Sequence, residues 1–181
     1  MSKDRTVHTS KFLSLVLRHQ PEKIGITLDS AGWVDVRELL DALARHGAAL
    51  SEAGLRDVVE SSDKKRFAFS EDGLRIRASQ GHSVGVDLGY RPATPPDVLY
   101  HGTVARFICS IRATGLDKGK RHHVHLSRDV ETATKVGGRR GEAIVLTIDA
   151  AGMARDGRVF YVSANGVWLT DHVPSEYIGF T

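Results

Sequence analysis

The fold of the first half of this chain is indicated most clearly by one stretch, Arg66-Phe67-Ala68-Phe69-Ser70-Glu71-Asp72-Gly73-Leu74-Arg75-Ile76-Arg77. Residues 66–69 and 74–77 alternate between polar and apolar side chains, which is the pattern of half-buried strands. The four residues between them, 70–73, have the composition of a turn. The stretch therefore predicts a β-hairpin.

Three short helices are expected before this hairpin, over residues 9–18, 35–47 and 51–60, because apolar side chains recur there at helical spacing. Three helices followed by a hairpin predict a winged-helix lobe over residues 1–80. Such lobes bind nucleic acid or mediate protein contacts, and the fold alone does not choose between the two. The expected helix signals are Thr9 or Ser10 as first N-cap, Asp35 with Glu38 as a capping box, Gly47 as a C-terminal stop, and Ser51 as third N-cap.

Residues 81–97 are rich in glycine and proline and lack an apolar period, as expected of a connecting loop. Residues 98–181 then predict a second lobe that is mainly β-sheet with two short helices, which gives an α+β fold overall. The expected helices cover 104–114 and 129–136, and the expected strands cover 98–101, 123–127, 143–148, 158–162, 167–170 and 177–180.

The composition of the 181-residue chain excludes several classes of protein. No run of about 18 apolar residues could cross a bilayer, and the first five residues lack the apolar stretch of a signal peptide. The single cysteine, Cys109, excludes a disulfide framework and a four-cysteine zinc site. A cytoplasmic protein without membrane contact is therefore expected.

Histidine and basic residues gather in the second lobe. Four of the nine histidines lie between positions 101 and 125, and residues 106–140 hold nine Lys or Arg against three acids. A zinc or iron site would need thiolates or carboxylates at ligand spacing, and Asp129 is the acid close to these histidines in sequence. The cluster is better suited to an anionic ligand, so no metal is expected.

His101-Gly102-Thr103 is expected at the end of a strand, where Gly102 would let a ligand approach the backbone and its neighbours would supply hydrogen bonds. Farther along, strand alternation places His123, His125 and Ser127 on one face. Taken alone, His101 is more often a satisfied, half-buried histidine than a ligand contact.

Cations recur at three further places, namely Arg18-His19 at a helix end, Arg66 at the start of the hairpin, and Arg139 in the glycine-rich turn 136–141. Guanidinium groups bind phosphate in a bidentate manner. If the two lobes face each other, these side chains could converge on one phosphate. Taken alone, the turn 136–141 is equally compatible with an exposed basic surface.

Taken together, the chain resembles the RNA 2′-phosphotransferases, the NAD-dependent enzymes of tRNA splicing, from about Ser10 to Phe180. The matching pieces are Ser14-Leu15-Val16-Leu17-Arg18-His19, Gly32-Trp33-Val34, Lys65-Arg66-Phe67, Tyr100-His101-Gly102-Thr103, His123-Val124-His125-Leu126-Ser127, Val136-Gly137-Gly138-Arg139 and Asn165-Gly166-Val167-Trp168-Leu169.

The resemblance implies a winged-helix lobe followed by an ADP-ribosyltransferase-like lobe. A monomer is expected separately, since nothing in the sequence indicates an oligomer. The resemblance also implies that NAD is consumed as co-substrate while an internal 2′-phosphate is removed from a tRNA-like RNA, leaving ADP-ribose 1″,2″-cyclic phosphate and nicotinamide. By motif match the catalytic set is Arg18, His19, Arg66 and Arg139, and His101, Gly102, Thr103 and Ser127 would hold NAD.

Two alternatives remain. The enzyme could ADP-ribosylate a terminal phosphate of RNA or DNA and stop there, or the chain could be a non-catalytic winged-helix binder of nucleic acid. Many ADP-ribosyltransferases carry a catalytic glutamate near the end of the domain, and no motif match places one here, since Glu176 lies outside the matched strand. This absence suits a phosphate nucleophile, which is already charged near neutral pH.

Overall fold

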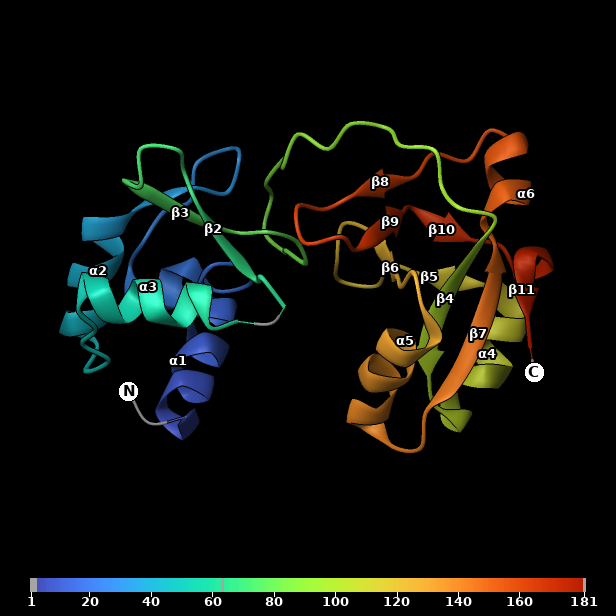
Figure 1. The fold of residues 1–181 in the computed structure, drawn as a ribbon, viewed down its shortest axis with the longest axis horizontal. Helices are drawn as coiled ribbons and strands as arrows, with labels where there is room; N and C mark the ends of the chain where they lie inside the picture. The colour runs from blue at the N-terminus through green and yellow to red at the C-terminus, as the bar shows by residue number, and fades with distance from the viewer. Residues whose placement is uncertain (1–2, 63, 181) are drawn as a thin grey trace. The chain divides into compact units, whose positions relative to one another are not determined.

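A computed structural model describes residues 3–62 and 64–180 of the chain. The chain divides into two compact units, Met1–Gly89 and Tyr90–Thr181, and the division falls inside the expected connecting segment 81–97. Helices and small antiparallel sheets occur together, which is compatible with an α+β fold (Figure 1). Among the described helices, none combines the length and hydropathy that a bilayer crossing requires.

The described residues of the first unit form three α-helices, and two of them begin as the sequence predicts. The Asp35 side chain accepts hydrogen bonds from the backbone N–H groups of Arg37 and Glu38, at 2.8 and 3.2 Å. Ser51 Oγ accepts from Gly54 N at 3.1 Å. These caps confirm the predicted starts of α2 and α3. The helices are α1 (Lys3–Val16), α2 (Val36–Arg45) and α3 (Glu52–Glu60), with a 3₁₀ turn, η1 (Pro21–Ile24), after α1.

The predicted start of the first helix was wrong. Helix α1 already begins at Lys3, so Thr9 and Ser10 lie within it instead of capping it. Its first turns are polar and lack the apolar spacing that marks a helix in sequence. Ser10 is buried in the helix, with 6% of its surface exposed.

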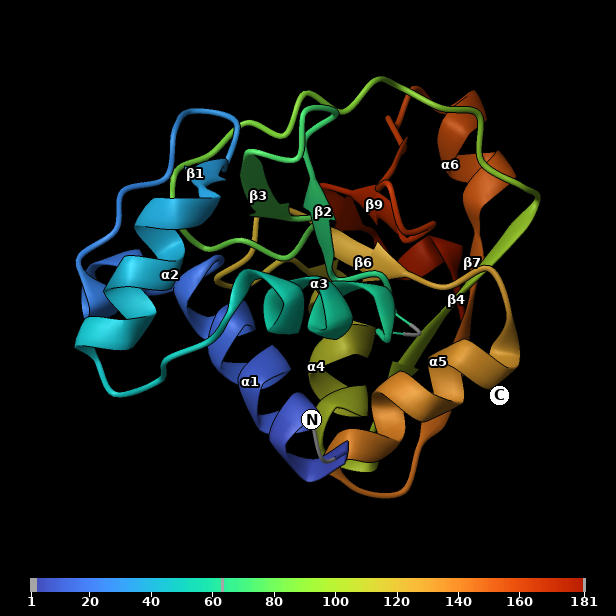
Figure 2. The same ribbon diagram turned by 60° about the vertical axis from the view of Figure 1, so that its left-hand side comes forward.

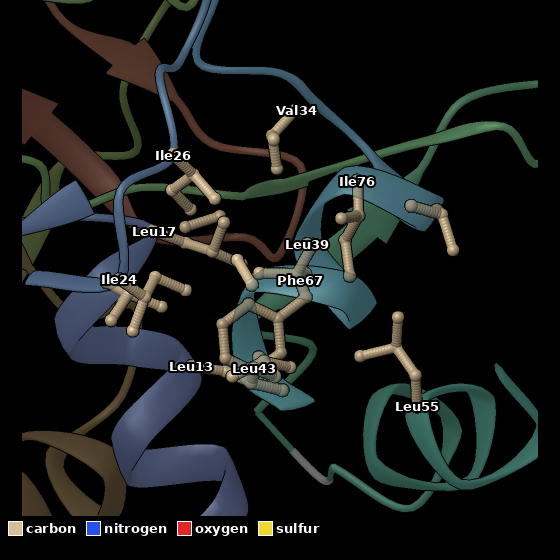
Figure 3. Close-up of a cluster of buried hydrophobic side chains, with 14 of the residues drawn as sticks. Leu13, Leu17, Ile24, Ile26, Val34, Leu39, Leu43, Leu55, Phe67 and Ile76 are labelled. Atoms are coloured by element: carbon tan, nitrogen blue, oxygen red, sulfur yellow. The ribbon is translucent and has the colours of Figure 1, made fainter. Parts of the chain in front are cut away.

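The predicted hairpin is confirmed as β2 (Phe67–Phe69) and β3 (Arg75–Ala78). A two-residue strand, β1 (Val34–Asp35), joins the other edge of β3, so the antiparallel order is β1-β3-β2. Figure 3 shows the core of this unit, a cluster in which Phe67 and Ile76 of the sheet are buried together with helix residues such as Leu13 and Leu39. Burial of these side chains supplies the main stabilisation of the unit.

The second unit is built on two three-stranded antiparallel sheets. One has the order β11-β7-β4 and the other β6-β9-β8. Tyr100 and Ser127 exchange backbone hydrogen bonds of 2.9 and 2.7 Å, and thereby join β4 to the end of β6. The strands are β4 (Val98–Thr103), β7 (Ile144–Asp149), β11 (Ile178–Gly179), β6 (Val124–Leu126), β8 (Tyr161–Val162) and β9 (Trp168–Thr170), and a separate pair is formed by β5 (Leu116–Asp117) and β10 (His172–Val173).

Within residues 90–180, the second unit has one more α-helix than predicted. Helix α6 (Ala150–Arg155) follows β7 directly, and Asp149 caps it by accepting from Gly152 N at 2.7 Å. The helix is short and contains a glycine, so it lacks a clear periodic signal. The two predicted helices are confirmed as α4 (Ala105–Thr114) and α5 (Val130–Gly137), and α5 lies along β4 (Figure 2). Two 3₁₀ turns, η2 (Gly138–Arg140) and η3 (Ser175–Tyr177), complete the unit.

Candidate functional site

The first unit brings together three of the four predicted catalytic residues. Arg18 and His19 follow α1, and Arg66 immediately precedes β2, 48 positions farther along the chain than Arg18. Arg18 Nη2 donates to the backbone oxygen of Arg66 at 3.3 Å. The arginines are half-buried and His19 is exposed, so the group forms a cationic surface supported by the core beneath it.

Two serines hold this cationic group, and sequence reasoning did not single them out. Arg66 Nη1 donates to Ser10 Oγ at 3.2 Å. His19 Nδ1 lies 2.9 Å from Ser83 Oγ, and the N–H of Ser83 donates to the backbone oxygen of Arg18 at 2.9 Å. Because these contacts join residues 56 to 65 positions apart, no local signal in the sequence could have indicated them.

The backbone that leads into β2 fixes the direction of Arg66. Lys65 has φ 38°, in the left-handed region that a non-glycine residue rarely adopts. The Ser79 hydroxyl donates to Lys65 O at 3.0 Å, and its N–H donates to Arg66 O at 2.9 Å. These bonds hold an unfavourable conformation that costs on the order of 1–2 kcal/mol.

In the second unit, His101 and Ser127 lie at the junction of β4 with β6. His101 Nδ1 is 3.0 Å from the backbone oxygen of His125, and Ser127 pairs with Tyr100, the neighbour of His101. Alternation along β4 puts the side chains of His101 and Thr103 on one face and Gly102 on the other. His101 and Thr103 therefore share one face of β4, with Thr103 buried, and Ser127 pairs with the strand at the neighbouring residue Tyr100.

The environment of His101 determines which ring nitrogen carries the proton. Burial lowers the pKa of His101, an effect that exceeds the opposing hydrogen bond to the His125 carbonyl, and Arg121 lowers the pKa further. The ring is therefore neutral at pH 7. A carbonyl can only accept, so Nδ1–H donates to His125 O and Nε2 remains an acceptor. A neutral acceptor suits a ligand hydroxyl.

Gly102 is required for the packing of α5, a reason that the sequence did not indicate. A Cβ on Gly102 would lie 1.8 Å from the backbone oxygen of Ala133 and 2.8 Å from the nitrogen of Gly137, so α5 occupies the direction in which a side chain would point. A Cβ on Gly137 would in turn lie 2.9 Å from Gly102 C and 3.0 Å from Thr103 N. The two glycines allow α5 to pack directly on the backbone of β4.

This packing also fixes the start of the turn that carries Arg139. The 3₁₀ turn η2 follows Gly137 without a break, and Gly137 is in contact with the backbone of Thr103. Arg139 itself is exposed. Its backbone is therefore tied to the same strand that carries His101, while its side chain extends from the surface.

Arg121 is a second cation of this unit that the sequence analysis did not select. Its Nη1 lies 3.5 Å from His125 Nδ1, and its charge acts on His101. A signal for it was present in the sequence, because Arg121 lies four residues before His125 and close to the matched segment 123–127. Over the described part of the chain, no three His, Cys, Asp or Glu side chains are grouped to hold a metal ion.

Comparison with known proteins adds to this geometry. The profile of the "RNA 2'-phosphotransferase, Tpt1 / KptA family" matches residues 4–172. The chain is similar to a "Probable RNA 2'-phosphotransferase" of Streptomyces coelicolor, with 59% identity over 99% of this chain and 98% of the relative. Proteins with the same description from Hahella chejuensis and Pseudomonas aeruginosa PAO1 are 56% and 57% identical, over 93% and 94% of this chain and 91% and 94% of their own lengths.

Proposed function

Because the chain belongs to the RNA 2′-phosphotransferase family, we propose that it removes an internal 2′-phosphate from a tRNA-like RNA with consumption of NAD. In the first step a phosphate oxygen attacks C1″ of the nicotinamide ribose, and the C–N bond to nicotinamide breaks. In the second step the ribose 2″-hydroxyl attacks phosphorus, and the bond to the RNA 2′-oxygen breaks. The products are RNA with a 2′-hydroxyl, ADP-ribose 1″,2″-cyclic phosphate and nicotinamide.

The observation that carries this proposal is the group Arg18, His19 and Arg66. Two guanidinium groups and an imidazole held by defined hydrogen bonds suit a phosphate that must be bound and aimed. Near pH 7 a phosphate monoester is already charged, so the first step needs no general base. The same cations would stabilise charge at phosphorus in the second step.

His19 is the candidate for proton transfer in the second step. The attacking 2″-hydroxyl loses a proton and the departing RNA 2′-oxygen gains one, so one group that accepts and then donates serves both needs. An imidazole can accept and release a proton near neutral pH, which suits this exchange. The Ser83 hydroxyl holds the ring through Nδ1.

We assign NAD binding to His101, Gly102, Thr103 and Ser127. The fit rests on His101, whose neutral Nε2 can accept a hydrogen bond from a ribose hydroxyl, and on Thr103 on the same face of β4. Gly102 would act through the packing of α5. In the second unit we propose Arg139 as the catalytic arginine, as the motif indicates, and Arg121 as a second candidate, because its guanidinium group contacts His125.

The finer description of the fold is part of this proposal. The order α1-β1-α2-α3-β2-β3 with a terminal hairpin supports a winged-helix lobe in the first unit. The two small sheets of the second unit, joined at Tyr100 and Ser127, support an ADP-ribosyltransferase-like lobe. RNA processing by such a protein would take place in the cytoplasm.

The test uses the purified chain, NAD, EDTA and a short single-stranded RNA that carries one internal 2′-phosphate. The expected products are the cyclic ADP-ribose phosphate and RNA with a 2′-hydroxyl. If the RNA keeps its phosphate, the proposal is wrong. An ADP-ribosylated terminal phosphate without cyclic product would favour the capping reaction instead, and activity lost with EDTA and restored by zinc would show a metal requirement.

Four alanine variants assign the residues. His19→Ala is expected to lower turnover without unfolding the protein, as is Arg66→Ala. Arg121→Ala and Arg139→Ala are compared under the same conditions, because only one of these arginines lies against His125. Loss of activity in Arg139→Ala alone would support the assignment by motif, and loss in Arg121→Ala alone would support the assignment by geometry.

A further inference from the structure

Three aromatic rings of the second unit form a cluster that the proposed reaction does not use. We propose that Tyr90, His123 and Tyr161 form a stacking platform for one nucleobase of the single-stranded RNA beside its 2′-phosphate. The inference rests on the proposed function, since it identifies a subsite for the same substrate. Aromatic rings that stack unpaired bases are the usual means by which proteins bind single-stranded RNA.

The rings contact one another and remain partly open to solvent. The ring centroids of His123 and Tyr161 are 5.4 Å apart, and Tyr90 lies 6.0 Å from His123 and 6.4 Å from Tyr161. The two contacts of His123 are edge-to-face, with interplanar angles of 68° and 63°. All three side chains are half-buried. Each ring is therefore fixed by the others while part of its surface can receive a ligand.

The backbone under the platform is ordered on each side. His123 immediately precedes β6, and Tyr161 begins β8 of the same sheet. The segment after Tyr90 runs beside β8, because Pro92 bridges to Tyr161 and Ala93 N donates to Phe160 O at 2.8 Å. A platform held in this way loses little conformational entropy when a base stacks on it.

The charges beside the platform suit an RNA strand. The loop before His123 carries three exposed cations, Lys118, Lys120 and Arg121. One of them is paired with an acid, since Lys118 Nζ lies 3.9 Å from Asp171 Oδ1. Cations next to aromatic rings bind the backbone and the bases of a single strand together. Burial lowers the pKa of His123, so its ring is neutral at pH 7 and can stack as an uncharged aromatic.

The platform lies beside the proposed NAD contacts and does not coincide with them. His123 and His125 share one face of the strand, two residues or about 7 Å apart, and His125 is the residue whose carbonyl holds His101. On the other side, Tyr161 is opposite Leu169, which is opposite His125. A neighbouring subsite is suited to the nucleoside next to the reacting phosphate, because the phosphate has to reach NAD.

The test combines a protein variant with a changed RNA. Tyr161→Leu removes the ring, and the RNA is prepared with and without the base on either side of the 2′-phosphorylated nucleotide. Equilibrium binding is measured by fluorescence anisotropy in the absence of NAD, so that it does not depend on turnover. We expect Tyr161→Leu to weaken binding of the intact RNA about tenfold. Binding of the RNA that lacks the stacked base is expected to be equally weak for both proteins.

The controls separate the platform from general effects. Tyr161→Phe keeps a ring and should bind like the unmodified protein, as should Phe107→Leu, which changes an exposed ring on α4. If Tyr161→Leu has a clearly lower Tm than the unmodified protein, the same measurements are made with Tyr90→Leu.

Equal weakening with intact and abasic RNA would overturn the proposal. So would unchanged RNA binding together with a raised KM for NAD, which would assign the rings to adenine. Failure of the proposed function is recognised separately, as absence of turnover by the unmodified chain.

Discussion

Substitution of Gly137 by alanine is expected to damage the enzyme through backbone packing alone. The new Cβ would lie 2.9 Å from Gly102 C and 3.0 Å from both N and O of Thr103, whereas ordinary contacts begin near 3.4 Å. Because backbone atoms cannot rotate away, α5 must move back from β4 by about half an ångström. Overpacking of this kind costs about 1–3 kcal/mol, and the better helix propensity of alanine offsets at most about 1 kcal/mol.

The expected result is therefore a net loss of about 1–2 kcal/mol, equivalent to a fall in Tm of about 2 to 8 °C in a chain of this size. Activity should fall more steeply. A misplacement of about 1 Å can cost on the order of 100-fold in rate, so half that displacement of Thr103 or Arg139 should lower kcat about tenfold. The assays are thermal denaturation by circular dichroism and release of nicotinamide at saturating RNA and NAD.

Gly138→Ala is the matched control. Gly138 has φ −60°, an ordinary helical value, and its Cβ would meet only Ala143 Cβ, at 4.0 Å. Adding the same methyl group one position later should leave kcat unchanged and should keep or slightly raise Tm. If Gly137→Ala were as stable and as active as Gly138→Ala, the argument that the glycine pair positions this part of the unit would be refuted.

Three further predictions follow from particular contacts. Since burial lowers the pKa of His101 from its ordinary value near 6.5, the KM for NAD at saturating RNA should change little between pH 8 and 7 and rise as the pH falls further, because the protonated ring can no longer accept through Nε2; a rise already between pH 8 and 7 would contradict the assignment. Ser10→Ala removes the acceptor of Arg66 Nη1 and should raise the KM for RNA several-fold while the KM for NAD stays unchanged, and equal changes in both would disprove a positioning role. Asp35→Ala removes the cap of α2 and should lower the free energy of unfolding, measured by urea denaturation, by about 1 kcal/mol while kcat is unaffected. Asp35→Asn keeps a capping oxygen and should retain most of this stabilisation.

Local signals in the sequence were sufficient for much of the fold. The caps at Asp35 and Ser51 and the alternating hairpin are short-range patterns, and each of them gave the right element. Elements that depend on distant partners were missed. The pair β5 and β10 has only two residues in each strand and joins Leu116 to Val173, so neither strand carries a signal of its own.

In the candidate site, too, local patterns could be predicted and distant contacts could not. Arg18 and Arg66 could be selected by motif, but the residues that bind their side chains could not. Ser10 looked like a helix cap because serine favours that position, whereas its hydroxyl is used inside α1 to accept from Arg66. Such a role depends on which distant side chain the fold brings to it, and this information is absent from any short window of sequence.

The tripeptide His101-Gly102-Thr103 illustrates how one motif can serve packing and chemistry together. A strand presents alternate side chains on opposite faces, so Gly102 faces α5 while His101 and Thr103 face the other way. Substitution of the glycine and substitution of the histidine would both lower activity, but for different physical reasons. A change at Gly102 acts by displacing a helix and must also lower Tm, whereas a change at His101 that preserves its bond to the His125 carbonyl should remove the proposed ligand contact alone. Activity and stability measured together therefore distinguish a residue that contacts the ligand from one that positions it.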